Sequence, residues 1–172
     1  MSRSKDMETE LTGAQASTGV ASAGSGEQRD YVTMSIGGQL FGIPVLKVQD
    51  VLGPQTITRV PLAPVEVAGS LNLRGRIVTA VDVRLRLGLP KRDSGKQAMS
   101  VVVEHEGELY SLLVDSVGEV LRLESRDYQR NPPTLNPRLR EFSDGIYRLN
   151  DSLLVVLSVS SLLNFGNRAD AA

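Results

Sequence analysis

The stretch GGQLFGIPVLKVQDVL (37–52) recurs in altered form as EGELYSLLVDSVGEVL (106–121), at a constant offset of 69 residues (106 minus 37). The matched pairs include Gly38 with Gly107, Leu40 with Leu109, Phe41 with Tyr110, Val48 with Val117, Asp50 with Glu119 and Val51 with Val120. A second block aligns at an offset of 76 and pairs Gly69 with Gly145, Leu73 with Leu149 and Val81 with Leu157. Self-similarity of this kind indicates an internal duplication.

Each copy alternates apolar and polar residues and contains turn signals, which predicts about five short strands per half. A half of roughly 65 residues buries too little surface to be stable alone, and closing a sheet into a barrel removes its exposed edges. We therefore expect a mainly β protein with two similar five-stranded β-barrels packed together and short helices, one of them at the C-terminus. The expected bounds are 31–90 for the first barrel, 98–157 for the second, and 158–165 for the terminal helix.

The two ends of the chain lack such patterns. Residues 1–30 are rich in Gly, Ser, Ala and Thr, and their only large apolar residues are Met7, Leu11 and Val20. Such a segment cannot offset its ordering entropy by burial, so we expect a disordered tail, with a transient helix over residues 5–11 as the structured alternative. Residues 167–172 are expected to fray.

Composition excludes several classes of function. The net charge of −1 and the 4% of aromatic residues, without Trp, argue against a nucleic-acid-binding barrel. The absence of Cys excludes disulfides and thiolate metal sites, and it fits a reducing compartment. No apolar run is long enough for a membrane span, and the N-terminus lacks the pattern of a signal peptide. We expect a cytoplasmic protein.

The residues give little support for catalysis, a metal or a cofactor. The single histidine, His105, lies beside a predicted hairpin turn, where an exposed structural role is expected. Asp82 and Asp115 follow apolar strands, where an aspartate usually caps the next turn or helix. We therefore expect that the protein is not an enzyme. Arg74 differs from the other basic residues because it lies in a tight turn, NLRG, from which a guanidinium can offer bidentate hydrogen bonds to a partner.

Three segments together resemble the CheW family of bacterial chemotaxis coupling proteins. They are YVTMSIGGQLFGIPVLKVQDVL from residue 31, the stretch TRVPLAPVEVAGSLNLRGRIVTAVDVRLRLGLP that contains the NLRG turn, and YSLLVDSVGEVLRL from residue 110. The similarity covers about residues 31–164, within an expected CheW-like domain of residues 31–166, and implies two SH3-like barrels around a shared apolar core. It departs from the usual pattern at Thr79, where the family often has Pro, and at Ser158, where an acid often precedes the last helix.

The resemblance implies a non-catalytic adaptor with no cofactor. Family members join the cytoplasmic tip of transmembrane chemoreceptors to the regulatory domain of the histidine kinase CheA, in arrays at the inner membrane. Carried over to this sequence, the receptor surface comprises Ile43, Val45, Val48, Asp50 and Arg74, of which Val48 also fits a core role. The kinase contacts are not assigned. An adaptor of a parallel chemosensory pathway and a small-ligand-binding barrel using His105 remain as alternatives.

Overall fold

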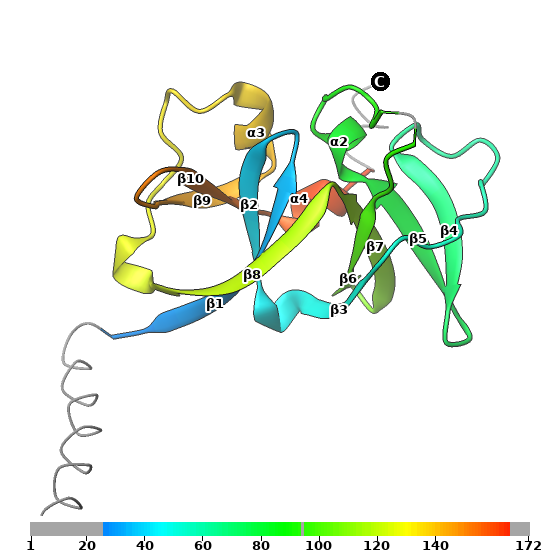
Figure 1. Cartoon of the computed structure of the whole chain (residues 1–172), viewed down its shortest axis with the longest axis horizontal. Helices are drawn as coiled ribbons and strands as arrows, with labels where there is room; N and C mark the ends of the chain where they lie inside the picture. The colour runs from blue at the N-terminus through cyan, green and yellow to red at the C-terminus, as the bar shows by residue number, and fades with distance from the viewer. Residues whose placement is uncertain (1–25, 94, 166–172) are drawn as a thin grey trace, which may run out of the picture.

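The computed structural model of the protein describes residues 26–93 and 95–165, which form two five-stranded sheets side by side (Figure 1). The first sheet has the order β8-β1-β2-β10-β9, with bounds Ser116–Glu124, Gln28–Ile36, Gln39–Pro44, Leu153–Leu157 and Ser143–Arg148. The second has the order β3-β6-β7-β5-β4, with bounds Val48–Leu52, Met99–His105, Glu108–Val114, Arg76–Asp82 and Val67–Leu73. This confirms the predicted mainly β class with two five-stranded units.

The predicted division into a barrel of residues 31–90 and another of residues 98–157 is wrong, because each sheet contains strands from both halves. The hairpin β1-β2 lies between β8 and β10, while β3 pairs with β6 of the other half. The chain leaves the first sheet through the 3₁₀ helix η1 (Val45–Lys47), which follows β2 and delivers β3 to the second sheet (Figure 1). The duplicated halves therefore exchange strands.

The exchange preserves the internal repeat. Shifting β1 to β5 onto β6 to β10 converts one strand order into the other, including the parallel pairs β2 with β10 and β7 with β5. Isolated bridges add a strand contact at the same place in both units, between Thr58 and Ser70 in one and between Gln129 and Ile146 in the other. The two offsets found in the sequence thus describe a structural pseudosymmetry.

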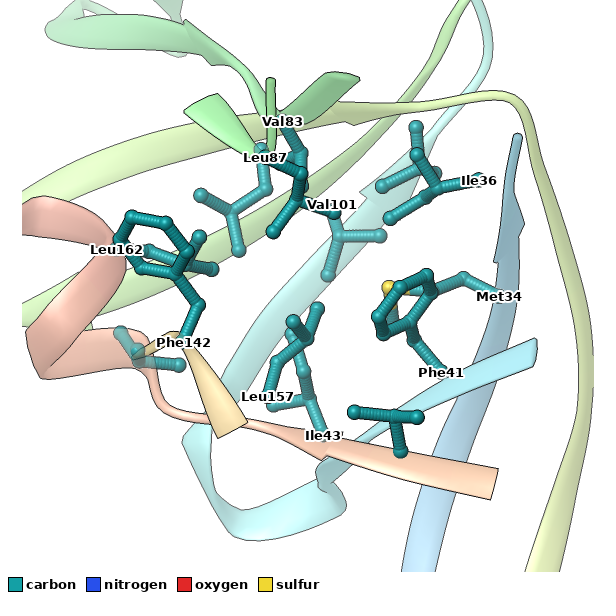
Figure 2. Packing of buried hydrophobic residues seen from close by; sticks show 14 of the residues in the cluster. Met34, Ile36, Phe41, Ile43, Val83, Leu87, Val101, Phe142, Leu157 and Leu162 are labelled. Carbon is teal, nitrogen blue, oxygen red and sulfur yellow. The ribbon is translucent and has the colours of Figure 1, made fainter. Parts of the chain in front are cut away.

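One hydrophobic core joins the two units (Figure 2). Its side chains come from both sheets, since Met34, Phe41 and Leu157 of the first sheet share a cluster with Val81 and Val101 of the second. All five are almost completely buried. At roughly 25 cal/mol per Å² of apolar surface removed from water, burying such side chains contributes about 1.5–3 kcal/mol each.

The short helices are held by side-chain caps. Asp82 accepts from the amide of Arg84 at the start of α2 (Val83–Arg86), and Ser158 accepts from the amide of Ser161 at the start of α4 (Val159–Leu163). The capping role predicted for Asp82 is confirmed. The segment between β8 and β9 adds η2 (Ser125–Asp127) and α3 (Pro137–Glu141).

Alternating arginine and leucine residues, as in RLRLG (84–88), are typical of a solvated charged face, but Arg86 is buried. Its guanidinium is buried between the rings of Phe142 and Phe165, 4.9 and 4.5 Å from their centroids. It donates to the carbonyl oxygens of Leu162, Ser161 and Asn164 at 2.8–3.1 Å. Arg86 thereby ties α2 to the C-terminal end of α4. Desolvation lowers its pKa from the usual value.

The first strand begins earlier than predicted, because residues 28–30 belong to β1 and pair with β8. Residues 1–25 of the predicted tail and residues 167–172 lie outside the described residues, and the terminal helix is shorter than the range 158–165. Within residues 26–93 and 95–165, no helix has the length and apolar character needed to cross a membrane.

Candidate functional site

Two of the predicted site residues, 24 positions apart in the sequence, form an ion pair on the surface. Asp50 lies in β3, and Arg74 lies in the turn between β4 and β5. Nη2 of Arg74 donates to Oδ2 of Asp50 at 2.9 Å, and Oδ1 of Asp50 accepts from the amide of Val51. The Arg74 side chain remains 73% exposed, so most of its five N–H donors face solvent. The pair fixes the direction of an exposed cation.

The backbone at Arg74 is in the left-handed region, with φ of 51°, and Gly75 follows with φ of 86°. The amide of Gly75 donates to Oδ1 of Asn72, which closes the turn. This conformation costs a residue with a Cβ about 1–2 kcal/mol relative to Gly. The β6-β7 turn has the same form, with Glu106 at φ of 51° before Gly107. The left-handed residue before Gly is therefore a shared property of the two hairpin turns.

The apolar residues predicted for this surface divide into two groups. Val45 and Val48 are half-buried and pack against the core, leaving part of each side chain accessible. Ile43 is wrongly assigned, because it is fully buried in the core and cannot reach a partner. The residues before it explain the error: alternation along β2 places Ile43 on the same side as Phe41, which is also buried.

Three exposed apolar side chains in η1, β3 and β8 are absent from the predicted site. Leu46 of η1 is 95% exposed, and Val51 of β3 is 37% exposed. Val120 of β8, which is the partner of Val51 in the internal repeat, is 55% exposed. The repeat itself carried this signal, because an apolar residue occurs at both equivalent positions. Exposed apolar side chains therefore occur at equivalent places on β3 and β8, which are edge strands of the two sheets.

A cavity of about 650 Å³ lies beside these residues, lined by Pro44 to Lys47, by residues 28–30 and by Arg122. Arg122 and Asp30, both in the wall of the cavity, form an ion pair in which Nε of Arg122 is 2.9 Å from Oδ1 of Asp30. Val45 and Leu46 provide the apolar part of its wall. Among the predicted site residues, only Val45 lines this cavity, so the Arg74–Asp50 pair lies outside it.

The residues considered for catalysis have structural partners. His105 lies at the end of β6, and its Nε2 is 3.8 Å from a carboxylate oxygen of Glu106. Asp82 caps α2, while Asp115 accepts from the amide of Gly37 at 2.8 Å and from Arg84 at 2.7 Å. No group of three or more potential metal ligands occurs in the part of the chain that the structure describes.

Asp115 connects three segments. Besides Gly37 in the β1-β2 turn, it binds Arg84 of α2 and Arg92 of the following linker, whose Nε lies 3.2 Å from Oδ1. Burial alone would raise the pKa of Asp115. The amide of Gly37 and the two guanidinium groups outweigh burial and hold this pKa below its usual value. Asp115 is therefore charged at neutral pH and joins the two barrels.

Two five-stranded sheets related by an internal repeat and joined by one core define a class of small duplicated β-barrel domains. Residues 30–166 match the family model described as a CheW-like domain. A chemotaxis protein CheW of Helicobacter pylori is 30% identical over 149 residues, which is 87% of this chain and 90% of that protein. A chemotaxis protein CheW of Rhizobium meliloti is 27% identical over 134 residues, covering 78% of this chain and 86% of the relative.

A solved structure agrees. The crystal structure of the scaffolding protein TtCheW from Thermoanaerobacter tengcongensis superimposes with a TM-score of 0.72 at 28% identity, covering 80% of this chain and 94% of that chain. The chain belongs to the CheW family.

Proposed function

We propose that this protein is a non-catalytic coupling protein that links the cytoplasmic tip of transmembrane chemoreceptors to the regulatory domain of a CheA-type histidine kinase. Family membership supports the chemotaxis scaffold, and the surface around β3 supports a site for a helical partner. The proposal places the protein in the cytoplasm, beside receptor arrays at the inner membrane, with no cofactor.

The receptor side is assigned to η1, β3 and the β4-β5 turn. Val45 and Val48 offer partly accessible apolar surface, to which the structure adds Leu46 and Val51. A helix that buries one apolar face against these residues would meet Arg74 at one side, where the free guanidinium donors can bind a carboxylate or a carbonyl of the helix. Asp50 sets the direction of Arg74 and so determines the register of the partner.

The observation that carries the proposal is the strained and exposed Arg74, fixed by Asp50. Arg74→Ala retains the Cβ and the turn but removes the guanidinium. We expect about a tenfold loss of affinity for a receptor-tip peptide hairpin, which corresponds to about 1.4 kcal/mol. Fluorescence or calorimetric titration measures the loss.

The matched control is Arg76→Ala, two residues away in the same hairpin. Arg76 is exposed, and no ion pair forms on it within the described residues. Its removal changes the net charge equally and should leave receptor affinity unchanged. Equal losses of receptor affinity in both variants would mean that the effect comes from the change in net charge and not from a specific contact of Arg74. Binding to the kinase regulatory domain should survive Arg74→Ala, and a parallel loss there would remove the assignment of Arg74 to the receptor.

A further inference from the structure

The cavity beside η1 combines an exposed apolar side chain with an excess of positive charge. Leu46 projects almost fully into solvent, next to Val45 and Pro44. Such an exposed leucine beside a hollow of about 650 Å³ is a surface that another apolar group would cover.

The charges that line this cavity favour an acidic occupant. Arg29, Lys47 and Arg122 contribute three positive charges, and Asp30 contributes one negative charge that Arg122 already binds. Within residues 26–93 and 95–165, neither Arg29 nor Lys47 has an ion-pair partner. Two cations therefore remain available to an incoming carboxylate.

The chain carries a segment of the complementary kind near its own N-terminus. The sequence DMETEL, residues 6–11, has three acidic residues, and its apolar residues Met7 and Leu11 are four positions apart. Residues at this spacing lie on one face of a helical turn. The segment thus offers two apolar side chains for Leu46 and Val45, flanked by carboxylates for Arg29 and Lys47.

The connection is long enough for this contact. Residues 12–27 separate the segment from Gln28, which itself lines the cavity, and most of them are Gly, Ala, Ser or Thr. For a segment of this Gly-, Ala- and Ser-rich composition and length, the expected end-to-end distance is about 20–24 Å. Tethering at that range gives an effective concentration on the order of millimolar, so weak contacts suffice for occupancy.

We infer that residues 6–11 bind in the cavity formed by β1, η1 and Arg122 of the same molecule. Bound there, the segment covers Val45 and Leu46, at the point where η1 leads into β3. If the proposed receptor surface is correct, on which this consequence rests, the N-terminal segment competes with the receptor helix and lowers its apparent affinity.

The test is paramagnetic relaxation enhancement in the full chain. The native sequence has no cysteine, so Thr9→Cys carries the only nitroxide label and replaces neither an apolar nor an acidic residue of the segment. We expect a strong loss of signal intensity at the amides of Arg29, Leu46 and Lys47. Amides of α2, which lies far from η1 in Figure 1, should retain their intensity.

Two variants identify the contact. Leu46→Ser changes an exposed residue and leaves the fold intact, and the double variant Met7→Ser/Leu11→Ser leaves the folded domain untouched. Each should restore intensity at Arg29 and Lys47, and so should high salt, which screens the charges. Undiminished signals in the parent protein, or a loss that persists in both variants, would overturn the inference.

A further experiment distinguishes binding within one molecule from binding to a second copy. It mixes isotope-labelled protein without nitroxide with unlabelled protein that carries the nitroxide. Signal loss in this mixture would mean that the segment binds a second copy, which contradicts the inference. This experiment uses neither receptor nor kinase. A negative result would therefore not affect the proposed coupling function, which the titration of Arg74→Ala tests. A negative result in that titration would likewise not affect the proposed contact in the cavity.

Discussion

Arg74 and Glu106 have the same left-handed backbone in two hairpin turns, and only Arg74 is assigned to partner binding. Replacing Glu106 by Gly should raise the free energy of unfolding by about 1 kcal/mol, because Gly adopts this conformation without strain. Arg74→Gly should raise it less, because the exposed ion pair with Asp50, worth about 0–1 kcal/mol, is lost. Urea denaturation measures both changes.

Receptor binding separates the two turns further. Arg74→Gly should weaken receptor-tip binding while Glu106→Gly should not, which would show that stability is given up at Arg74 for function. Retention of full affinity by Arg74→Gly would contradict this explanation of the strained turn.

Ile43 and Leu46, three residues apart, should respond oppositely to truncation. Ile43→Ala removes buried core volume and is expected to cost about 2–5 kcal/mol of stability. Leu46→Ala removes an exposed side chain and should leave the free energy of unfolding within about 0.5 kcal/mol of the parent. A small effect of Ile43→Ala on the free energy of unfolding, measured by heat or urea, would contradict the assignment of Ile43 to the core.

The residues of the site were only partly predictable. The NLRG turn is visible in the sequence because Gly75 marks it, whereas the ion pair between Arg74 and Asp50 depends on how the sheet brings β3 near the β4-β5 turn. Ile43 was misplaced because the apolar character of a position does not by itself say whether it faces the core or a partner.

At the scale of elements, Asp115 makes the stability of the protein depend on pH. The pKa of Asp115 is lower in the folded protein than the value of about 3.9 for an unfolded chain. Its stabilising contribution is therefore complete above that unfolded pKa and is lost as the pH falls through the folded pKa. Denaturant titrations between pH 7 and pH 3 should show this loss.

Asp115→Asn should lower stability at pH 7 and flatten the acid dependence, because the charge that binds Arg84 and Arg92 is gone. The control is Asp151→Asn in the exposed β9-β10 turn, which should retain the slope of the parent. An unchanged slope in Asp115→Asn would show that other carboxylates dominate the acid response.

Arg86 links α2 with α4, and its loss should be costly. Arg86→Met keeps the length of the side chain but leaves the carbonyl oxygens of Ser161, Leu162 and Asn164 without this donor. Hydrogen bonds to a charged group contribute about 1.5–3 kcal/mol each, so we expect a loss of at least about 3 kcal/mol. Arg76→Met, at an exposed position, should be close to neutral in the same thermal unfolding experiment.

Across the whole molecule, the repeat and the number of strands were predictable, but the exchange of strands was not. A half that closed on itself would have the order β3-β1-β2-β5-β4, which the same local pattern of apolar residues would produce. The direction of the chain at η1, from one sheet to the other, decides between the two arrangements. The chain also changes sheets at Asp115, between β7 and β8, and the periodicity of the strands indicates neither crossing.

Because the two halves of the chain exchange strands, we expect that neither half folds alone. A chain cut at residue 94 yields one fragment that lacks partners for β1, β2, β3 and β5, and another that lacks partners for β6, β7, β8 and β10. Each fragment should be unfolded by circular dichroism, and an equimolar mixture should recover β structure and a cooperative unfolding transition. A cooperative transition in either isolated fragment would contradict the shared core.

Coupling itself is tested most directly by recruitment of the kinase to receptors. Membranes that carry the cognate chemoreceptor are mixed with the CheA-type kinase and increasing amounts of this protein, and the kinase that sediments with the membranes is measured. We expect recruitment that rises and saturates with the protein, and that Arg74→Ala reduces while Arg76→Ala does not. Sedimentation of the kinase that is independent of this protein at every concentration would contradict the coupling function.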